Sequence, residues 1–94
     1  MARLSLDHIQ QQLQNLQGWK FGNNAITKQF TLKGFGAAMA LVNKVAEAAQ
    51  KANHHPDIVI NYNRVTFTCS THEAGGVTEK DIALAKQIEA AARP

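Results

Sequence analysis

Three of the four histidines of this chain lie in one short stretch, and histidine is the side chain best suited to proton transfer near neutral pH. Two of them, His54 and His55, directly precede Pro56, and the third is His72. An unperturbed imidazole has a pKa of about 6.5, so it can both give and take a proton near pH 7. The stretch therefore predicts general acid–base chemistry.

The residues around these histidines predict how they are brought together. Pro56 has a fixed φ and no N–H, so a preceding helix must end here, and His55 is pushed toward an extended conformation. Alternating apolar residues then predict two strands, Asp57 to Asn61 and Arg64 to Thr71, joined by a turn at Tyr62-Asn63. Such a hairpin would carry the third histidine back toward the first two.

Each of these residues also has a simpler interpretation. His54 and His55 could be a polar helix end whose rings only cap carbonyl groups. In extended chain they would point in opposite directions, so both can face one ligand only if the backbone bends between them. His72 could be an ordinary residue at a strand end, and Tyr62 a turn or packing residue.

A metal site is the other common use of clustered histidines and acidic residues. Asp57, Glu73 and Asp81 lie near the three histidines in the sequence. The chain has no His-Glu-x-x-His motif and no second cysteine, and adjacent histidines are awkward chelators. It also lacks a glycine-rich phosphate loop. We therefore expect no metal and no cofactor.

Periodic patterns predict the remaining elements. Leu6, Ile9, Leu13 and Leu16 form the stripe of a first helix that ends at Gly18, and a first hairpin follows over 19–32 with its turn at 22–24. A long alanine-rich helix is expected from Phe35 to about Asn53, with an apolar stripe of Phe35, Met39, Val42, Ala46 and Ala49. A last helix should begin at Glu79, because Thr78 and Asp81 resemble a capping box, and its buried stripe would be Leu84, Ala85, Ile88 and Ala92.

The order helix, hairpin, helix, hairpin, helix predicts the fold class. We expect an α+β two-layer sandwich, in which three helices cover one face of a four-stranded antiparallel sheet. Residues 1–94 are enough for a single domain with one core. An open sheet leaves two edges to protect, which favours a homodimer or homotetramer.

Composition excludes several classes of partner. The formal net charge is +3 and the basic residues are dispersed without a run, so we expect no direct nucleic-acid binding. No apolar run suggests a membrane helix, and the N-terminus lacks the apolar core of a signal peptide, so we expect a cytoplasmic protein. The single cysteine, Cys69, sits in an alternating strand pattern, which favours a buried thiol.

The spacing of the singled-out residues resembles the signature of the pterin-4a-carbinolamine dehydratases. His54-His55-Pro56 is followed after five residues by Tyr62, after nine more by His72, and after eight more by Asp81. Other segments are similar to that family too, so the resemblance covers nearly the whole chain: Gly18-Trp19, Ile26 to Phe30, Phe35 at the start of a helix, and Ser70 to Glu73. One position departs, because many members carry a charged residue where this chain has Gln50.

The resemblance implies the same α+β architecture and a reaction, loss of water from a 4a-hydroxytetrahydropterin to give the quinonoid dihydropterin. This reaction would recycle the cofactor of aromatic amino acid hydroxylases. It implies acid–base work and pterin contact for His54, His55 and His72, with the division between acid and base left open. Asp81 would support a histidine or touch the ring, and Pro56 and Tyr62 would bind or support the substrate.

The family also offers an alternative of another class. Some members act as dimerisation cofactors of a homeodomain transcription factor, through helix surfaces and not through the pterin pocket. Such a role would need an exposed apolar patch on a helix. This chain would then bind a protein partner and have little or no enzymatic role.

Overall fold

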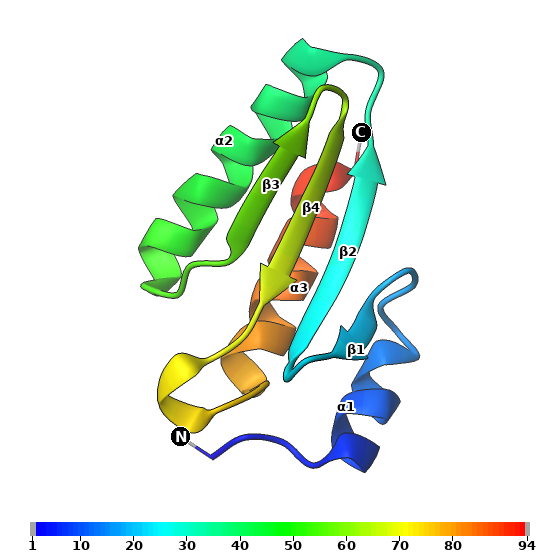
Figure 1. The fold of residues 1–94 in the computed structure, drawn as a ribbon. Coiled ribbons are helices and arrows are strands. Elements are labelled where there is room, and N and C mark those ends of the chain that lie inside the picture. The colour runs from blue at the N-terminus through cyan, green and yellow to red at the C-terminus, as the bar shows by residue number, and fades with distance from the viewer. Residues whose placement is uncertain (1, 94) are drawn as a thin grey trace.

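The computed structural model describes residues 2–93 and confirms the predicted order of elements. The helices are α1 (Leu6–Leu13), α2 (Phe35–Ala52) and α3 (Glu79–Ala92), and a short 3₁₀ helix, η1, spans His72–Ala74. The strands are β1 (Lys20–Gly22), β2 (Ala25–Thr31), β3 (Asp57–Asn61) and β4 (Arg64–Cys69). Figure 1 shows α2 and α3 behind the sheet, and α1 beside β1.

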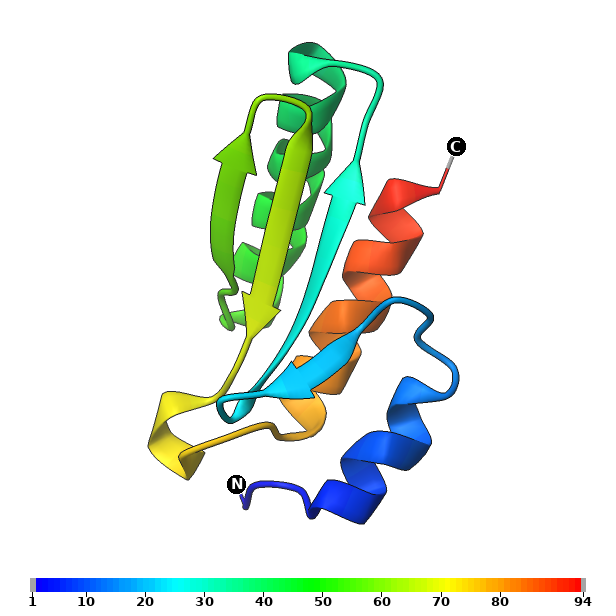
Figure 2. The same cartoon turned by 45° about the vertical axis from the view of Figure 1, so that its right-hand side comes forward.

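The four strands form one antiparallel sheet in the order β1-β2-β4-β3. The two hairpins therefore meet through β2 and β4, where Ile26 pairs with Cys69 and Phe30 with Val65. This leaves β1 and β3 as the edge strands of the sheet. Figure 2 shows how the sheet twists, so that β1 and α1 diverge from the β3–β4 hairpin.

Side-chain alternation divides the sheet into a covered face and an open face. Val65, Phe67 and Cys69 of β4 are completely buried against the helices. Thr66 and Thr68 point to the other face, where they hydrogen-bond Gln29 and Thr27 of β2. Because successive residues of a strand face opposite sides, the open face is lined with polar side chains at its centre.

Local signals explain where most elements begin and end. Asn53 ends α2 in the left-handed conformation, with φ of 52°, three residues before Pro56. Thr78 caps α3, and the backbone N–H of Thr78 donates to the carboxylate of Asp81, so the predicted capping box is present. Tyr62, with φ of 57°, makes the turn between β3 and β4.

Two details of the helices differ from the prediction. On α2 the buried residues are Ala38, Leu41, Val45 and Ala49, whereas Phe35 is 53% exposed and Ala46 is exposed. The helix is so rich in alanine that its apolar period does not mark one face. The first helix ends at Leu13 and not at Gly18 as predicted, because residues 14–16 form hydrogen bonds between residues three apart.

Candidate active site

The His54-His55-Pro56 segment links the end of α2 to the start of β3. The left-handed Asn53 reverses the chain, and the N–H of His54 returns to the carbonyl of Ala49 at 3.1 Å. Pro56 then holds the chain extended into β3. The two histidine side chains leave this segment toward different surroundings.

His54 faces inward and is held by a buried carboxylate. Its Nε2 lies 2.6 Å from Oδ1 of Asp81, and its side chain is only 13% exposed while that of Asp81 is fully buried. Because an ionised carboxylate can only accept hydrogen bonds, Nε2 must be the donor. The other oxygen of Asp81 accepts from the hydroxyl of Thr71 at 2.7 Å and from the N–H of Thr78 at 2.9 Å.

His55 faces outward and is exposed. Its Nε2 lies 2.5 Å from the side-chain oxygen of Gln50, one turn back on α2. The amide oxygen is an acceptor, so this contact also makes Nε2 the donor and leaves Nδ1 as the ring's second nitrogen for a ligand. The Gln50 position, where the sequence departs from many relatives, therefore contacts a histidine directly.

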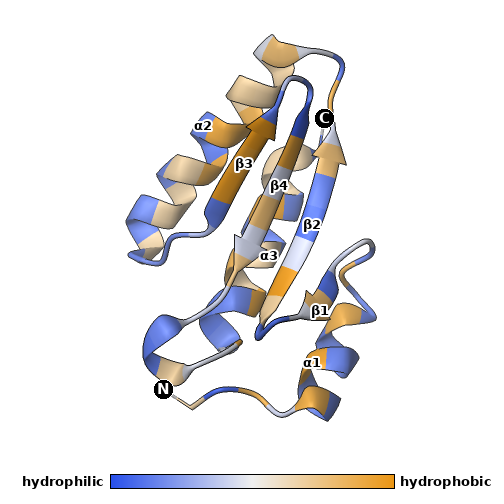
Figure 3. Cartoon of the chain, in the orientation of Figure 1, coloured by the Kyte–Doolittle hydropathy of each residue, from blue (hydrophilic) through white to orange (hydrophobic). Residues whose placement is uncertain are grey.

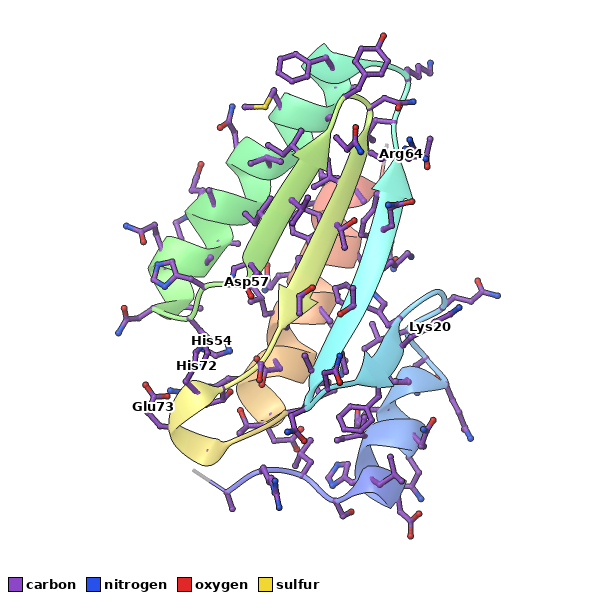
Figure 4. All side chains as sticks on the ribbon, in the orientation of Figure 1. Lys20, His54, Asp57, Arg64, His72 and Glu73 are labelled. Atoms are coloured by element: carbon purple, nitrogen blue, oxygen red, sulfur yellow. The ribbon has the colours of Figure 1, made fainter. Side chains whose placement is uncertain are left out.

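His72 lies in η1, just after β4. The loop that carries it is closed by Thr71 and Gly76, whose backbone N–H and carbonyl groups pair in both directions, at 2.9 and 3.3 Å. Gly75 turns this loop with φ of 72°, a conformation that disfavours side chains with a Cβ. In the view of Figure 4 His72 is labelled directly beside His54, between η1 and the segment that follows α2.

His55 and His72 line one cavity of about 390 Å³ on the open face of the sheet. Its volume lies within the range of roughly 300–1,000 Å³ that is usual for small-molecule sites. Asp57 is its acidic lining residue, and the hydroxyl groups of Thr27, Thr68 and Ser70 add further hydrogen-bonding atoms. Two imidazoles, a carboxylate and hydroxyls around one cavity can bind a polar heterocycle and move protons to and from it.

A larger cavity of about 510 Å³ lies between α2 and α3. Its lining includes Lys44, Lys51 and Lys80 with several alanines, and His54 is the predicted site residue among them. His54 is the single imidazole of this lining, and its Nε2 already donates to Asp81. We therefore take the smaller cavity, with its two histidines, as the candidate active site.

The predicted site residues are thus divided among several places. Tyr62 is 67% exposed at the far end of the β3–β4 hairpin and lines neither cavity, and Pro56 lines neither. Asp81 reaches His54 and not the smaller cavity. Sequence reasoning missed Ser70 and Thr68, although their alternation with the buried Cys69 indicated the open face.

The inward-facing residues of β4 behind the cavity, Val65, Phe67 and Cys69, are fully buried. Burial raises the pKa of the Cys69 thiol to about 12, and the carboxylates of Asp81 and Asp57 add to the effect. The thiol is therefore protonated and buried, as the strand pattern predicted. Among residues 2–93, no group of three His, Cys, Asp or Glu side chains is arranged to hold a metal ion.

Comparisons with known proteins agree on one family. The family described as pterin 4 alpha carbinolamine dehydratase matches residues 2–91. A protein from Thermomicrobium roseum named "Putative pterin-4-alpha-carbinolamine dehydratase" is 51% identical over 88 residues, which cover 94% of this chain and 95% of that protein. A protein of the same name from Nocardia farcinica is 50% identical, over 96% of this chain and 95% of its own length.

Solved structures give the same result for the fold. A crystal structure of a transcriptional coactivator/pterin dehydratase from Brucella melitensis superposes with a TM-score of 0.93 at 39% identity, covering 97% of this chain and 99% of that one. A pterin dehydratase-like RuBisCO assembly factor of the α-carboxysome is only 19% identical, with a TM-score of 0.66 over 79% of this chain and 86% of its own, and so shares the fold. No helix within residues 2–93 has the length and apolar character needed to span a bilayer.

Proposed function

Because the chain belongs to the pterin-4α-carbinolamine dehydratase family, we propose that it removes water from a 4a-hydroxytetrahydropterin and releases the quinonoid dihydropterin. One observation supports this most strongly. His55 and His72 are separated by a whole hairpin in the sequence, yet they line the same cavity. The reaction needs two proton transfers on one small heterocycle, and two imidazoles around one cavity match that need.

The proposed mechanism is a dehydration with one acid and one base. Hydroxide is a poor leaving group, so an imidazolium protonates the 4a-oxygen as the carbon–oxygen bond breaks. A neutral imidazole takes the proton from the neighbouring ring nitrogen, and the electron pair of that bond forms the new imine. His55 and His72 share these two roles. After one turnover the acid is a neutral imidazole and the base is an imidazolium, so the two exchange roles, or exchange a proton with solvent, before the next turnover.

Other lining groups would hold the substrate. The pyrimidine part of a pterin carries an amino group and a ring N–H, which are hydrogen-bond donors. Asp57 offers a carboxylate acceptor at the edge of the cavity, and Thr68 and Ser70 offer hydroxyl oxygens. His54 and Asp81 lie behind this lining, and we propose that their bond fixes the bend that turns His55 outward.

The direct test is an assay of quinonoid dihydropterin formation from chemically generated carbinolamine. The wild-type protein should raise the rate above the spontaneous reaction, and a variant with both His55→Gln and His72→Gln should not. A wild-type rate equal to the spontaneous rate would rule out the proposed function. In the cell this activity would serve the recycling of the pterin cofactor of aromatic amino acid hydroxylases in the cytoplasm.

We also propose that the protein works as a homodimer or homotetramer. The edge strand β3 is hydrophobic over most of its length, as Figure 3 shows, and Val59 on it is 61% exposed. An exposed apolar edge strand favours pairing with another chain, and a second copy is the partner always present. Light scattering should give a mass of two or four chains, and a monomer at micromolar concentration would contradict the proposal.

A protein-binding role is the alternative, and the description of the Brucella melitensis protein as a transcriptional coactivator favours it. The cavity between α2 and α3 offers a helix surface for such a partner. The two roles separate by mutation. Ala83→Glu in this cavity should weaken a protein partner at unchanged turnover, whereas His55→Gln should abolish turnover and leave the partner bound.

A further inference from the structure

Asp81 ends a connected series of buried hydrogen bonds. The donor and the acceptor of each bond in the series follow from the chemistry of the groups that form it. Thr71 has a single hydroxyl proton, and its Oγ1 lies 2.7 Å from Oδ2 of Asp81. The carboxylate cannot donate, so Thr71 donates to it. Oγ1 of Thr71 must then accept from the hydroxyl of Thr78, which lies 2.8 Å away. Thr78 in turn accepts from the N–H of Lys80 at 3.2 Å.

This series of hydrogen bonds fixes the orientation of the Asp81 carboxylate. Oδ2 is occupied by the hydroxyl of Thr71 and the N–H of Thr78, so Oδ1 is turned toward Nε2 of His54. Thr71, Thr78 and Asp81 are each 5% exposed or less, so solvent does not compete for these bonds. Buried hydrogen bonds to a charged group are stronger than neutral ones and restrict its rotation.

Thr71 has a second set of contacts on its backbone. It precedes His72, and its N–H and carbonyl both pair with Gly76, which closes the loop that carries His72. Thr71 thus connects the loop that carries His72 to the His54–Asp81 pair. Its backbone anchors the His72 loop, and its side chain holds the carboxylate to which His54 is bonded.

We propose that Thr71 is a positioning residue that couples the His72 loop to the His54–Asp81 pair, and so sets the direction of both histidine-bearing segments at once. This assignment rests on the proposed dehydratase function for its effect on turnover, but not for its effect on the histidines themselves. Thr71 does not line the cavity, so it acts through its neighbours and not on the substrate. The capping role of Thr78 and Asp81 alone would not require the hydroxyl of Thr71.

The test compares Thr71→Val, which keeps the shape and removes the hydroxyl, with Thr71→Ser, which keeps the hydroxyl. Thr31→Val is the matched control, because Thr31 is exposed on β2. We expect Thr71→Val to lower kcat about tenfold, because displacing a catalytic group by about 1 Å can cost up to about 10²-fold in rate. Thr71→Ser and Thr31→Val should stay within about twofold of wild type.

Two measurements separate positioning from general stability. Nitrogen-15 NMR of the histidine rings should show His54 protonated at Nε2 in wild type and a changed ring signal in Thr71→Val, and hydrogen exchange of the Thr71 and Gly76 amides should accelerate in that variant. Wild-type kcat and an unchanged His54 signal in Thr71→Val would overturn the proposal. So would a wild-type His54 protonated only at Nδ1, a result that needs no variant to fold. If the wild-type protein lacks dehydratase activity, the proposed function fails, while the ring signal and amide exchange still test the coupling.

Discussion

His54 and His55 are neighbours in the chain, but they occupy opposite kinds of environment. His54 is nearly buried and hydrogen-bonded to the carboxylate of Asp81, which accepts two further hydrogen bonds. His55 is exposed, contacts the neutral side-chain amide of Gln50 and lines a cavity. The extended segment before Pro56 sends successive side chains in opposite directions. Identical residue types can therefore have different roles, and the surroundings of each ring decide which.

The largest expected effect is the loss of turnover when a histidine of the cavity is replaced. His55→Gln or His72→Gln should lower kcat by roughly 10²–10⁴-fold, the range for loss of an acid–base group, with little change in melting temperature. His8→Gln, on α1, is the matched control and should retain full turnover. The quinonoid-pterin assay and a thermal melt check both quantities. Near-wild-type turnover in either cavity variant would remove that histidine from the chemistry.

The burial of groups behind the cavity can be tested at Cys69. This residue lies between Thr68 and Ser70 of the cavity, but its side chain points into the core. Raising its pKa from 9.0 to about 12 reduces the thiolate fraction at pH 8 about a thousandfold, and only the thiolate is nucleophilic. We expect iodoacetamide to alkylate the native protein at least that much more slowly than the protein unfolded in guanidinium chloride. The difference should shrink as pH rises toward 12, since the native thiol then ionises. Equal rates at pH 8 would show that Cys69 is accessible.

Asp81→Asn should act on stability more than any substitution at the cavity. The amide has one oxygen in place of two, so at least one donor among His54, Thr71 and Thr78 loses its acceptor. Leaving a buried donor without its acceptor costs roughly 1–3 kcal/mol, so we expect a drop of that size in the free energy of unfolding. Urea denaturation measures it, with the exposed Glu79→Gln as the control. A change in the free energy of unfolding below about 0.5 kcal/mol would mean that Asp81 contributes no more than an exposed residue does.

Asp81→Asn should also lower turnover by about an order of magnitude or more, because the bend before His55 loses its anchor. A structural cap alone predicts full turnover for the folded fraction. The assay is therefore run well below the melting temperature of the variant, with the folded fraction measured in the same buffer. Full turnover there would return Asp81 to a purely structural role.

The smallest effect is expected at Tyr62, far from both histidines at the other end of the hairpin. Surface substitutions distant from a site typically change free energies by less than about 0.5 kcal/mol, so Tyr62→Phe should alter kcat and KM by no more than about twofold. Steady-state kinetics with the carbinolamine checks this. A large rise in KM would mean that Tyr62 reaches a substrate, which in this structure would have to be bound by another copy of the chain.

The sequence predicted the parts of the fold that depend on local signals. Asn53 with Pro56, Thr78 with Asp81, and the turn at Tyr62 each set an element boundary through their own backbone preferences. The buried face of α2 was predicted less well, because alanine contributes little contrast between faces. Phe35 is exposed although it is the largest apolar residue of that helix.

The structure brings His55 and His72 around one cavity, as the hairpin pattern predicted, whereas the catalytic roles of the histidines stay a prediction. The hairpin pattern was sufficient to predict that His72 returns toward His54 and His55. Which ring turns inward depends on Asp81, and the orientation of Asp81 depends on Thr71, a residue ten positions earlier in the chain. That contact forms only when the loop after β4 packs on the start of α3, so no local pattern in the sequence indicated it.

We expect a pterin to bind between His55 and His72 while His54 stays bonded to Asp81. The most direct measurement is a titration of nitrogen-15-histidine-labelled protein with 7,8-dihydrobiopterin, an unreactive analogue of the product, followed by NMR of the imidazole rings. We predict that the ring signals of His55 and His72 shift together as the ligand is added, and that the Nε2–H signal of His54 is retained. Shifts confined to His54, at the cavity between α2 and α3, would contradict this account.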